Sequence, residues 1–108
     1  MDIYYKVLYL LELYFKESNW KRYFLHGGCY WLTNYLHYHI SDSVIMINRQ
    51  TEHCALYFEQ ALYDVTGRID KNSFHIASER EISFMKKNYV PKFDTNKLEQ
   101  YLKEKLKA

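Results

Sequence analysis

Residues 53–65 read HCALYFEQALYDV, and this stretch decides the fold that the sequence predicts. Two runs of aliphatic and aromatic residues, 53–58 and 61–65, are separated only by Glu59-Gln60. Such runs joined by a two-residue connection are typical of an antiparallel β-hairpin. We expect Gly67 to close the hairpin, so that an antiparallel sheet lies at the centre of the fold.

Outside the hairpin, the sequence predicts one more strand and four helices. Residues 44–47 form a β-type run and give the third strand. Apolar residues recur every three or four positions in 3–17, in a second helix that begins at Cys29, in a third that begins with the capping box of Ser78 and Glu81, and in a last helix that Asp94 or Thr95 caps. Residues 20–24 are expected to add a short helical turn.

This order predicts an α+β protein with a small three-stranded antiparallel sheet, two N-terminal helices and two C-terminal helices. Helices are expected to cover one face of the sheet. No repeat, low-complexity stretch or linker divides the chain, so residues 1–108 are expected to form one domain.

The charge limits the kinds of molecule that the protein is expected to bind, and the cysteine content indicates the cellular compartment. With 15 basic and 13 acidic residues, the formal charge of +2 argues against direct binding to nucleic acid or to a membrane surface. No apolar stretch is long enough to span a membrane, and the N-terminus lacks the pattern of a signal peptide. Together with only two cysteines, this predicts free thiols in a reducing, cytoplasmic setting.

The aromatic content is unusual, because the chain holds twelve Tyr, six Phe and two Trp. Tyr and Trp bury a large ring but need a partner for the polar end, so we expect many rings at the boundary of the core. The alternative is an aromatic surface that binds a base, a sugar or another protein.

Cys29 is the first candidate for chemistry, because it follows Gly27-Gly28 and opens a predicted helix. The start of a helix carries partial positive charge and free N–H groups, which favour a thiolate over a thiol. The two glycines would also let a substrate backbone approach closely. The competing interpretation is a thiol that only packs in the core.

His53 and Asp64 are the candidates for the base and for the group that orients it. In a hairpin that turns at Glu59-Gln60, His53 faces Thr66, and Asp64 becomes its diagonal neighbour on the same face of the sheet. A three-residue loop would place the two on opposite faces. The alternatives are a structural histidine and an aspartate that organises the turn before Thr66-Gly67.

The remaining cysteine and histidines offer no second site. Cys54 directly follows His53, so alternation in the strand points its side chain to the opposite face, into the core. His26, Cys29, His53 and Cys54 could form a zinc site only on paper, since no ligand pair has zinc spacing. His37 and His39 lie on different faces of their helix, and His75 is expected in a loop. No cofactor motif is present, so no cofactor is predicted.

Three segments carry a resemblance to a known family: GGCYWL at 27–32, EHCALYF at 52–58 and LYDVTG at 62–67. They resemble the core of papain-like cysteine enzymes, most closely the NlpC/P60 and transglutaminase-like branches. The whole chain, including YDVTG at 63–67 and MKKNYVPKFD at 85–94, also resembles small proteins of phages and prophages in Gram-positive bacteria.

The resemblance implies acyl transfer on a protein or peptide-like substrate, as in a cysteine peptidase, amidase or acyltransferase. Cys29 would attack the carbonyl, His53 would act as base, Asp64 would hold the imidazole, and the Cys29 N–H would supply part of an oxyanion hole. The papain branch places a Gln several residues before its Cys, and this chain has none there. His26 or Asn19 are the residues that could substitute for it.

Two further functions stay open at this stage. The chain could be a non-catalytic phage-type inhibitor that binds a bacterial host or defence protein of the CRISPR type on the same fold, through exposed aromatic or charged residues. A structural role in a phage particle is the third possibility, although no repeat or coiled coil points to it. The sequence does not reveal the oligomeric state.

Overall fold

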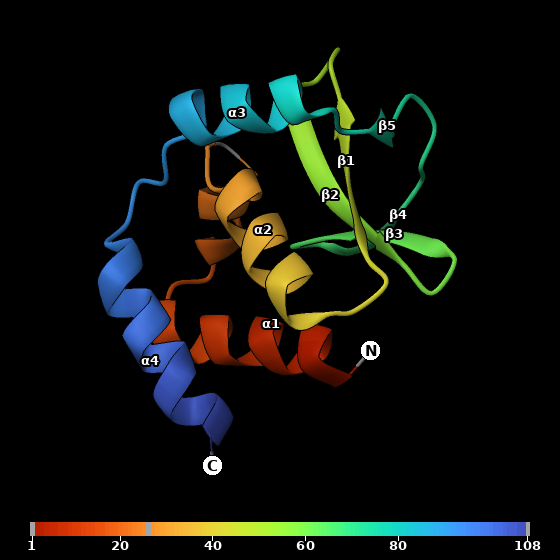
Figure 1. Ribbon diagram of the computed structural model, residues 1–108. Helices are drawn as coiled ribbons and strands as arrows, with labels where there is room; N and C mark the ends of the chain where they lie inside the picture. The colour runs from red at the N-terminus through yellow and green to blue at the C-terminus, as the bar shows by residue number, and fades with distance from the viewer. Residues whose placement is uncertain (1, 26, 108) are drawn as a thin grey trace.

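The computed structural model of the chain describes residues 2–25 and 27–107, and Figure 1 shows how the elements follow one another. The elements in chain order are α1 (Asp2–Phe15), the 3₁₀ helix η1 (Trp20–Phe24), α2 (Cys29–His39), β1 (Val44–Asn48), β2 (His53–Phe58), β3 (Ala61–Asp64), β4 (Gly67–Ile69), β5 (His75–Ile76), α3 (Glu79–Asn88) and α4 (Thr95–Lys107). The protein is therefore an α+β protein, as the sequence predicts.

The sheet has five strands in the order β4-β3-β2-β1-β5, and every neighbouring pair is antiparallel. The prediction of three strands was wrong. Gly67 was expected to end the hairpin, but it begins a further strand, β4, with its backbone at φ +111°. His75 lies in β5 and not in a loop. Both added strands are too short, at three and two residues, to show the alternation by which strands are predicted.

The β2–β3 hairpin turns at Glu59 and Gln60, as expected. Its register pairs Phe58 with Ala61 and Leu56 with Tyr63. Glu59 and Gln60 both have positive φ, at 50° and 66°. This is the backbone of the turn that matches the twist of the flanking strands, even though the sequence lacks the usual Asn-Gly.

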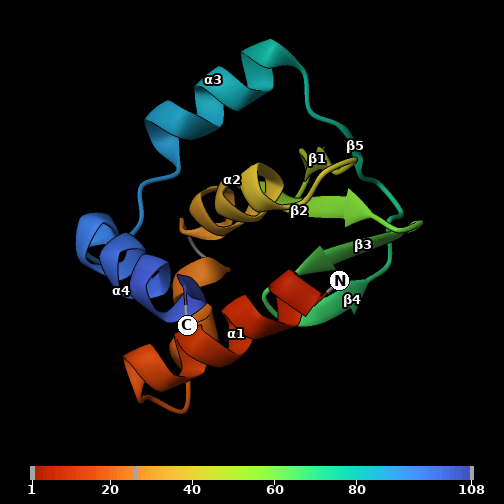
Figure 2. The same cartoon turned by 60° about the horizontal axis from the view of Figure 1, so that its bottom comes forward.

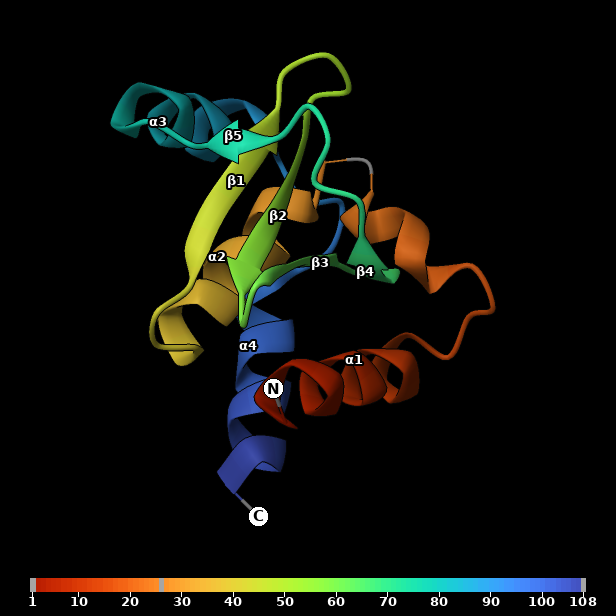
Figure 3. The same cartoon turned by 90° about the vertical axis from the view of Figure 1, so that its right-hand side faces the viewer.

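Helix α2 packs across β2 and β1, and α1 and α4 pack against each other beside it (Figures 1 and 2). Figure 3 shows α1 below the β3–β4 end of the sheet. The buried side chains between these elements form the core, and the largest of those with almost no exposure are Tyr4, Val7, Leu11, Phe24, Ile47, Leu56, Phe58, Leu62, Val65, Met85, Leu98 and Leu102.

The capping hydrogen bonds that the sequence predicts at the starts of α3 and α4 are present. The Ser78 side chain accepts a hydrogen bond from the Glu81 N–H at 3.1 Å, and the Glu81 carboxylate accepts from the Ser78 N–H at 2.9 Å. Of the two caps considered for the last helix, Asp94 accepts from the Lys97 N–H at 3.1 Å. Within residues 2–25 and 27–107, no helix has the length and apolar character needed to cross a membrane.

Many of the aromatic rings pack against one another in and around the core. Phe93 contacts the rings of Phe15, Phe24 and Trp31, at centroid distances of 5.7, 5.1 and 5.5 Å. The Tyr4 hydroxyl donates a hydrogen bond to the backbone carbonyl of Asp64. Core packing therefore accounts for part of the aromatic content, and it joins α1 to the strand that carries Asp64.

Candidate functional site

Gly27 and Gly28 permit the close backbone packing from which α2 begins. A Cβ on Gly27 would lie 2.8 Å from the carbonyl oxygen of Val90, and Gly27 also has φ +100°. A Cβ on Gly28 would lie 2.1 Å from the carbonyl oxygen of Tyr23. The glycines therefore make room for the protein's own backbone, which fixes the position of Cys29 at the first turn of the helix.

His53 and Asp64 are hydrogen-bonded across the β2–β3 hairpin. The distance from His53 Nε2 to Asp64 Oδ2 is 2.8 Å, and the two side chains are 16% and 8% exposed. The two-residue turn places them in diagonal register on one face, as the sequence geometry requires. The second oxygen of Asp64, Oδ1, accepts from the Thr66 N–H at 2.7 Å and from the Thr66 hydroxyl. Asp64 therefore holds the turn and the imidazole together.

The Cys29 thiol interacts with Cys54 and His53 at the start of β2. Figure 1 shows that α2 and β2 both begin near α3. The pKa of Cys29 is lowered to about 5. The largest cause is a hydrogen bond from the Cys54 thiol, followed by burial, which opposes it, and by a hydrogen bond and positive charge from His53. The structure therefore favours a Cys29 thiolate at neutral pH.

The pKa of His53 is raised to about 9. Burial is the largest single influence and acts to lower it, but the hydrogen bonds to Asp64 and Cys29 together outweigh burial. The pKa of Asp64 is lowered, because hydrogen bonds from His53 and Thr66 overcome the opposing effect of burial. The three groups thus form a chain of a thiolate, an imidazolium and a carboxylate.

Cys54 is fully buried, as expected for a core residue. Its thiol lies 3.7 Å from the Thr33 hydroxyl on α2. Its hydrogen bond to Cys29 and its burial both raise its pKa well above the ordinary value. Cys54 therefore keeps its proton and stabilises the neighbouring thiolate, a role that the sequence did not suggest. Both cysteines are free thiols.

Two tyrosines near the thiols were missed in the sequence. The pKa of Tyr89 is raised to about 12 by burial and then by the negative charge on Cys29. Tyr89 lines two cavities, of about 240 and 300 Å³. The Tyr30 hydroxyl is buried and lacks a hydrogen-bond partner among the described residues, and burial raises its pKa. A tyrosine directly after an α-helix and one inside a helix give no sequence signal for such a place.

The remaining candidate residues that the structure describes do not join the Cys29 cluster. Asn19 precedes η1, and within the described residues no hydrogen bond joins its side chain to Cys29. His26 lies outside the described residues. His37 contacts the Ser43 hydroxyl at 2.8 Å, and His75 contacts Glu81 at 2.9 Å. In the part of the chain that the structure describes, no group of three His, Cys, Asp or Glu side chains could hold a metal ion.

Fold and site together define a small α+β protein in which a cysteine at a helix start meets a histidine and an aspartate on a β-hairpin. A family model described as phage YunG-like protein matches residues 7–103. This match covers most of the chain, so the chain belongs to the phage YunG-like protein family. Searches of the curated proteins and of the solved structures find no match.

The family match confirms one part of the resemblance stated from the sequence and leaves the other without support. The chain is a small phage-type protein, as expected. The comparisons give no evidence for a papain-like or NlpC/P60 core, and the sheet has five strands where the sequence pattern predicted three.

Proposed function

We propose that Cys29 is the nucleophile of an acyl-transfer reaction, with His53 as general acid and base and Asp64 as the group that orients the imidazole. The observation that carries the proposal is the 2.8 Å hydrogen bond between His53 Nε2 and Asp64 Oδ2 beside the Cys29 thiol. Because Nε2 is engaged with Asp64, Nδ1 is the nitrogen that remains for Cys29. A nucleophile, a base and an orienting carboxylate in that order are the requirements of a triad.

In the proposed first step, the Cys29 thiolate attacks the carbonyl carbon of an amide and a C–S bond forms. The proton on His53 passes to the leaving nitrogen as the C–N bond breaks, which leaves an acyl group on Cys29 and a neutral imidazole. In hydrolysis, His53 then takes a proton from water while the water oxygen attacks the thioester. The carboxylic acid leaves, and the thiolate and the imidazolium return.

The start of α2 would stabilise the developing oxyanion. Among residues 2–25 and 27–107 no side chain caps this helix, so its first backbone N–H groups would be available to donate to a ligand. The charge of Cys29 acts on Tyr89, and Tyr89 lines a cavity. Its hydroxyl is therefore the group that would donate a hydrogen bond to the oxyanion in place of the missing Gln. The cavity of about 240 Å³ at Tyr89 combines apolar side chains with charged ones, a mixed lining that suits a peptide-like substrate; the other lining residues are Ile47, Arg49, Glu52, Arg80, Glu81 and Phe84.

Acylation by an activated ester tests the proposal directly. Wild-type protein is mixed with p-nitrophenyl acetate, nitrophenolate release is followed by absorbance, and the acylated residue is located by peptide mass spectrometry. We expect a burst of nitrophenolate and an acetyl group on Cys29, with both lost in Cys29→Ala and the burst strongly slowed in His53→Ala. Cys54→Ala is expected to keep the acetyl group on Cys29 but to slow the burst, because the Cys54 thiol hydrogen-bonds the Cys29 thiolate. An unlabelled Cys29 in the folded wild type would contradict the proposal.

A second candidate function is favoured by the burial of Cys29, which is only 3% exposed, and by membership of a phage family. In this case the protein is a non-catalytic inhibitor of a bacterial host or defence protein, and the Cys29 cluster only supports the fold. The test compares phage plating on cells with a CRISPR-type defence that express wild type or Cys29→Ala. Equal protection of the phage by both proteins favours the inhibitor, and loss of protection in a folded Cys29→Ala favours the enzyme.

A further inference from the structure

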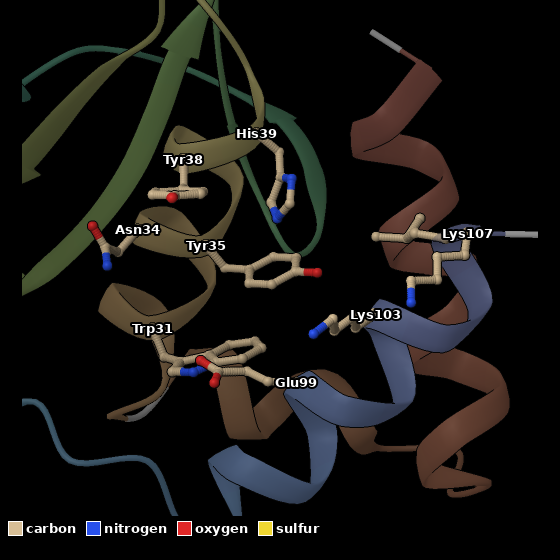
Figure 4. Close-up of a pocket in the computed structure, with 9 residues that line it drawn as sticks. Trp31, Asn34, Tyr35, Tyr38, His39, Glu99, Lys103 and Lys107 are labelled. Atoms are coloured by element: carbon tan, nitrogen blue, oxygen red, sulfur yellow. The ribbon is translucent and has the colours of Figure 1, made fainter.

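A cavity that none of Cys29, His53 and Asp64 lines lies between α2 and α4. Its volume is about 700 Å³, within the range of about 300–1,000 Å³ that is usual for small-molecule sites. Figure 4 shows side chains from both helices around it. The lining residues are Trp31, Asn34, Tyr35, Tyr38, His39, Glu99, Lys103, Leu106 and Lys107. We call this cavity the α2–α4 groove.

Three neighbouring rings line the α2 side of the groove. Trp31 and Tyr35 are stacked, with centroids 5.3 Å apart and planes 11° apart, and the ring of His39 follows 4.6 Å from that of Tyr35. The rings of Tyr35 and His39 point from α2 toward α4 (Figure 4). Bases stack on aromatic side chains, so a row of rings of this kind can take a planar base.

The α4 side of the groove adds two ammonium groups. Lys103 and Lys107 are one helical turn apart, and both are exposed. Among the residues that the structure describes, neither has a carboxylate within ion-pair distance. Glu99 is the single acidic side chain of the lining, so positive charge exceeds negative charge across the groove.

The outer rim of the groove offers a flat ring and an amide. Tyr38 is 87% exposed, which is rare for a large aromatic side chain, and Asn34 lies one turn before it on α2. An amide can donate and accept hydrogen bonds at once, as the edge of a nucleobase requires. The groove therefore joins ring surface and a base-edge partner at one rim to a pair of cations at the other.

We propose that the α2–α4 groove binds a nucleoside monophosphate, with the base against the rings of α2 and the phosphate at Lys103 and Lys107. A free nucleotide fits better than a nucleic acid strand. Two lysines match the charge of one phosphate, whereas a strand needs a track of cations that a formal charge of +2 does not supply. This site is separate from the Cys29 cluster and does not depend on its chemistry.

Isothermal titration calorimetry with AMP, GMP, CMP and UMP tests the proposal on the full chain. We expect saturable binding of at least one nucleotide, weakened about tenfold or more by Lys103→Glu, as loss of one charge-assisted contact implies. Lys97→Glu is the matched control, because it makes the same charge change on an exposed part of α4 outside the groove. It is expected to leave the affinity unchanged.

Control ligands test the contacts to the phosphate and the contacts to the base separately. Inorganic phosphate and adenosine are each expected to bind at least about tenfold more weakly than the nucleotide, since each makes only half of the contacts. Absence of nucleotide binding at millimolar concentration would overturn the proposal, as would equal effects of Lys103→Glu and Lys97→Glu. Phosphate that binds as tightly as the nucleotide would also overturn it, and so would a short single-stranded oligonucleotide that binds much more tightly.

Discussion

The thiolate of Cys29 should make the stability of the folded protein depend on pH in a particular window. Its pKa in the folded state is about 5, against 9.0 for an unperturbed thiol. A group whose folded pKa is lowered contributes stability above its unfolded pKa and loses that contribution as the pH falls through the folded value. For Cys29 alone, stability therefore rises with pH from about 5 to 9.

His53 acts in the opposite direction over part of that range. Its pKa is about 9 in the folded protein against 6.5 unfolded, so its contribution is complete below 6.5 and is lost as the pH rises toward 9. Between pH 6.5 and 9, the gain in stability from Cys29 and the loss from His53 offset each other. Between pH 5 and 6.5 only the Cys29 term changes, and about 1.5 pH units at 1.36 kcal/mol each give a gain of about 2 kcal/mol.

Urea unfolding under reducing conditions at several pH values between 5 and 6.5 measures this gain. Cys29→Ser is the matched control, because it replaces the thiol by a hydroxyl that stays protonated in this range. It also lowers the pKa of His53, but a His53 pKa that stays above 6.5 adds no change between pH 5 and 6.5. We expect the free energy of unfolding to rise by about 2 kcal/mol more in the wild type than in Cys29→Ser over this interval. Parallel pH profiles for the two proteins would refute the assignment of the thiolate to Cys29.

Three further predictions concern residues that position Cys29 and His53. Asp64→Asn removes the charge that faces His53 Nε2, so the pKa of His53 should fall, as an NMR titration of its ring can show; an unchanged pKa would remove Asp64 from the site. Gly28→Ala brings a Cβ against the Tyr23 carbonyl and should lower the free energy of unfolding by about 1–3 kcal/mol, whereas a neutral effect in denaturant titration would mean that the helix start is not tightly packed. Leu56→Ala empties a fully buried position and should lower it by about 2–5 kcal/mol in the same assay, and a loss well below that would contradict the burial of β2.

The sequence predicted the elements whose signals are local and repeated. The apolar spacing in α1 and the capping box at Ser78 each mark a helix within a few residues, and the glycine pair marks the start of α2. The turn at Glu59-Gln60 was predicted because two polar residues separate two strand-like runs, and this turn brings His53 and Asp64 together. The catalytic role of these residues stays a prediction.

Features that depend on distant neighbours could not be predicted. Strand β5 exists because His75 and Ile76 pair with β1, although both side chains are exposed and show no strand pattern. Alternation placed Cys54 in the core, but only the packing of α2 against β2 brings its thiol to Cys29. The α2–α4 groove likewise needs two helices that are separated by the whole sheet in the sequence.

The most direct test of the central claim is the rate at which iodoacetamide alkylates each cysteine of the folded protein as a function of pH, read by mass spectrometry. Cys29 should react with an apparent pKa near 5, and His53→Ala should move that pKa upward and slow the reaction at neutral pH. Cys54 serves as the internal reference and should stay unreactive throughout. A Cys29 that reacts only above pH 8, with the same profile in His53→Ala, would contradict the thiolate–imidazolium pair.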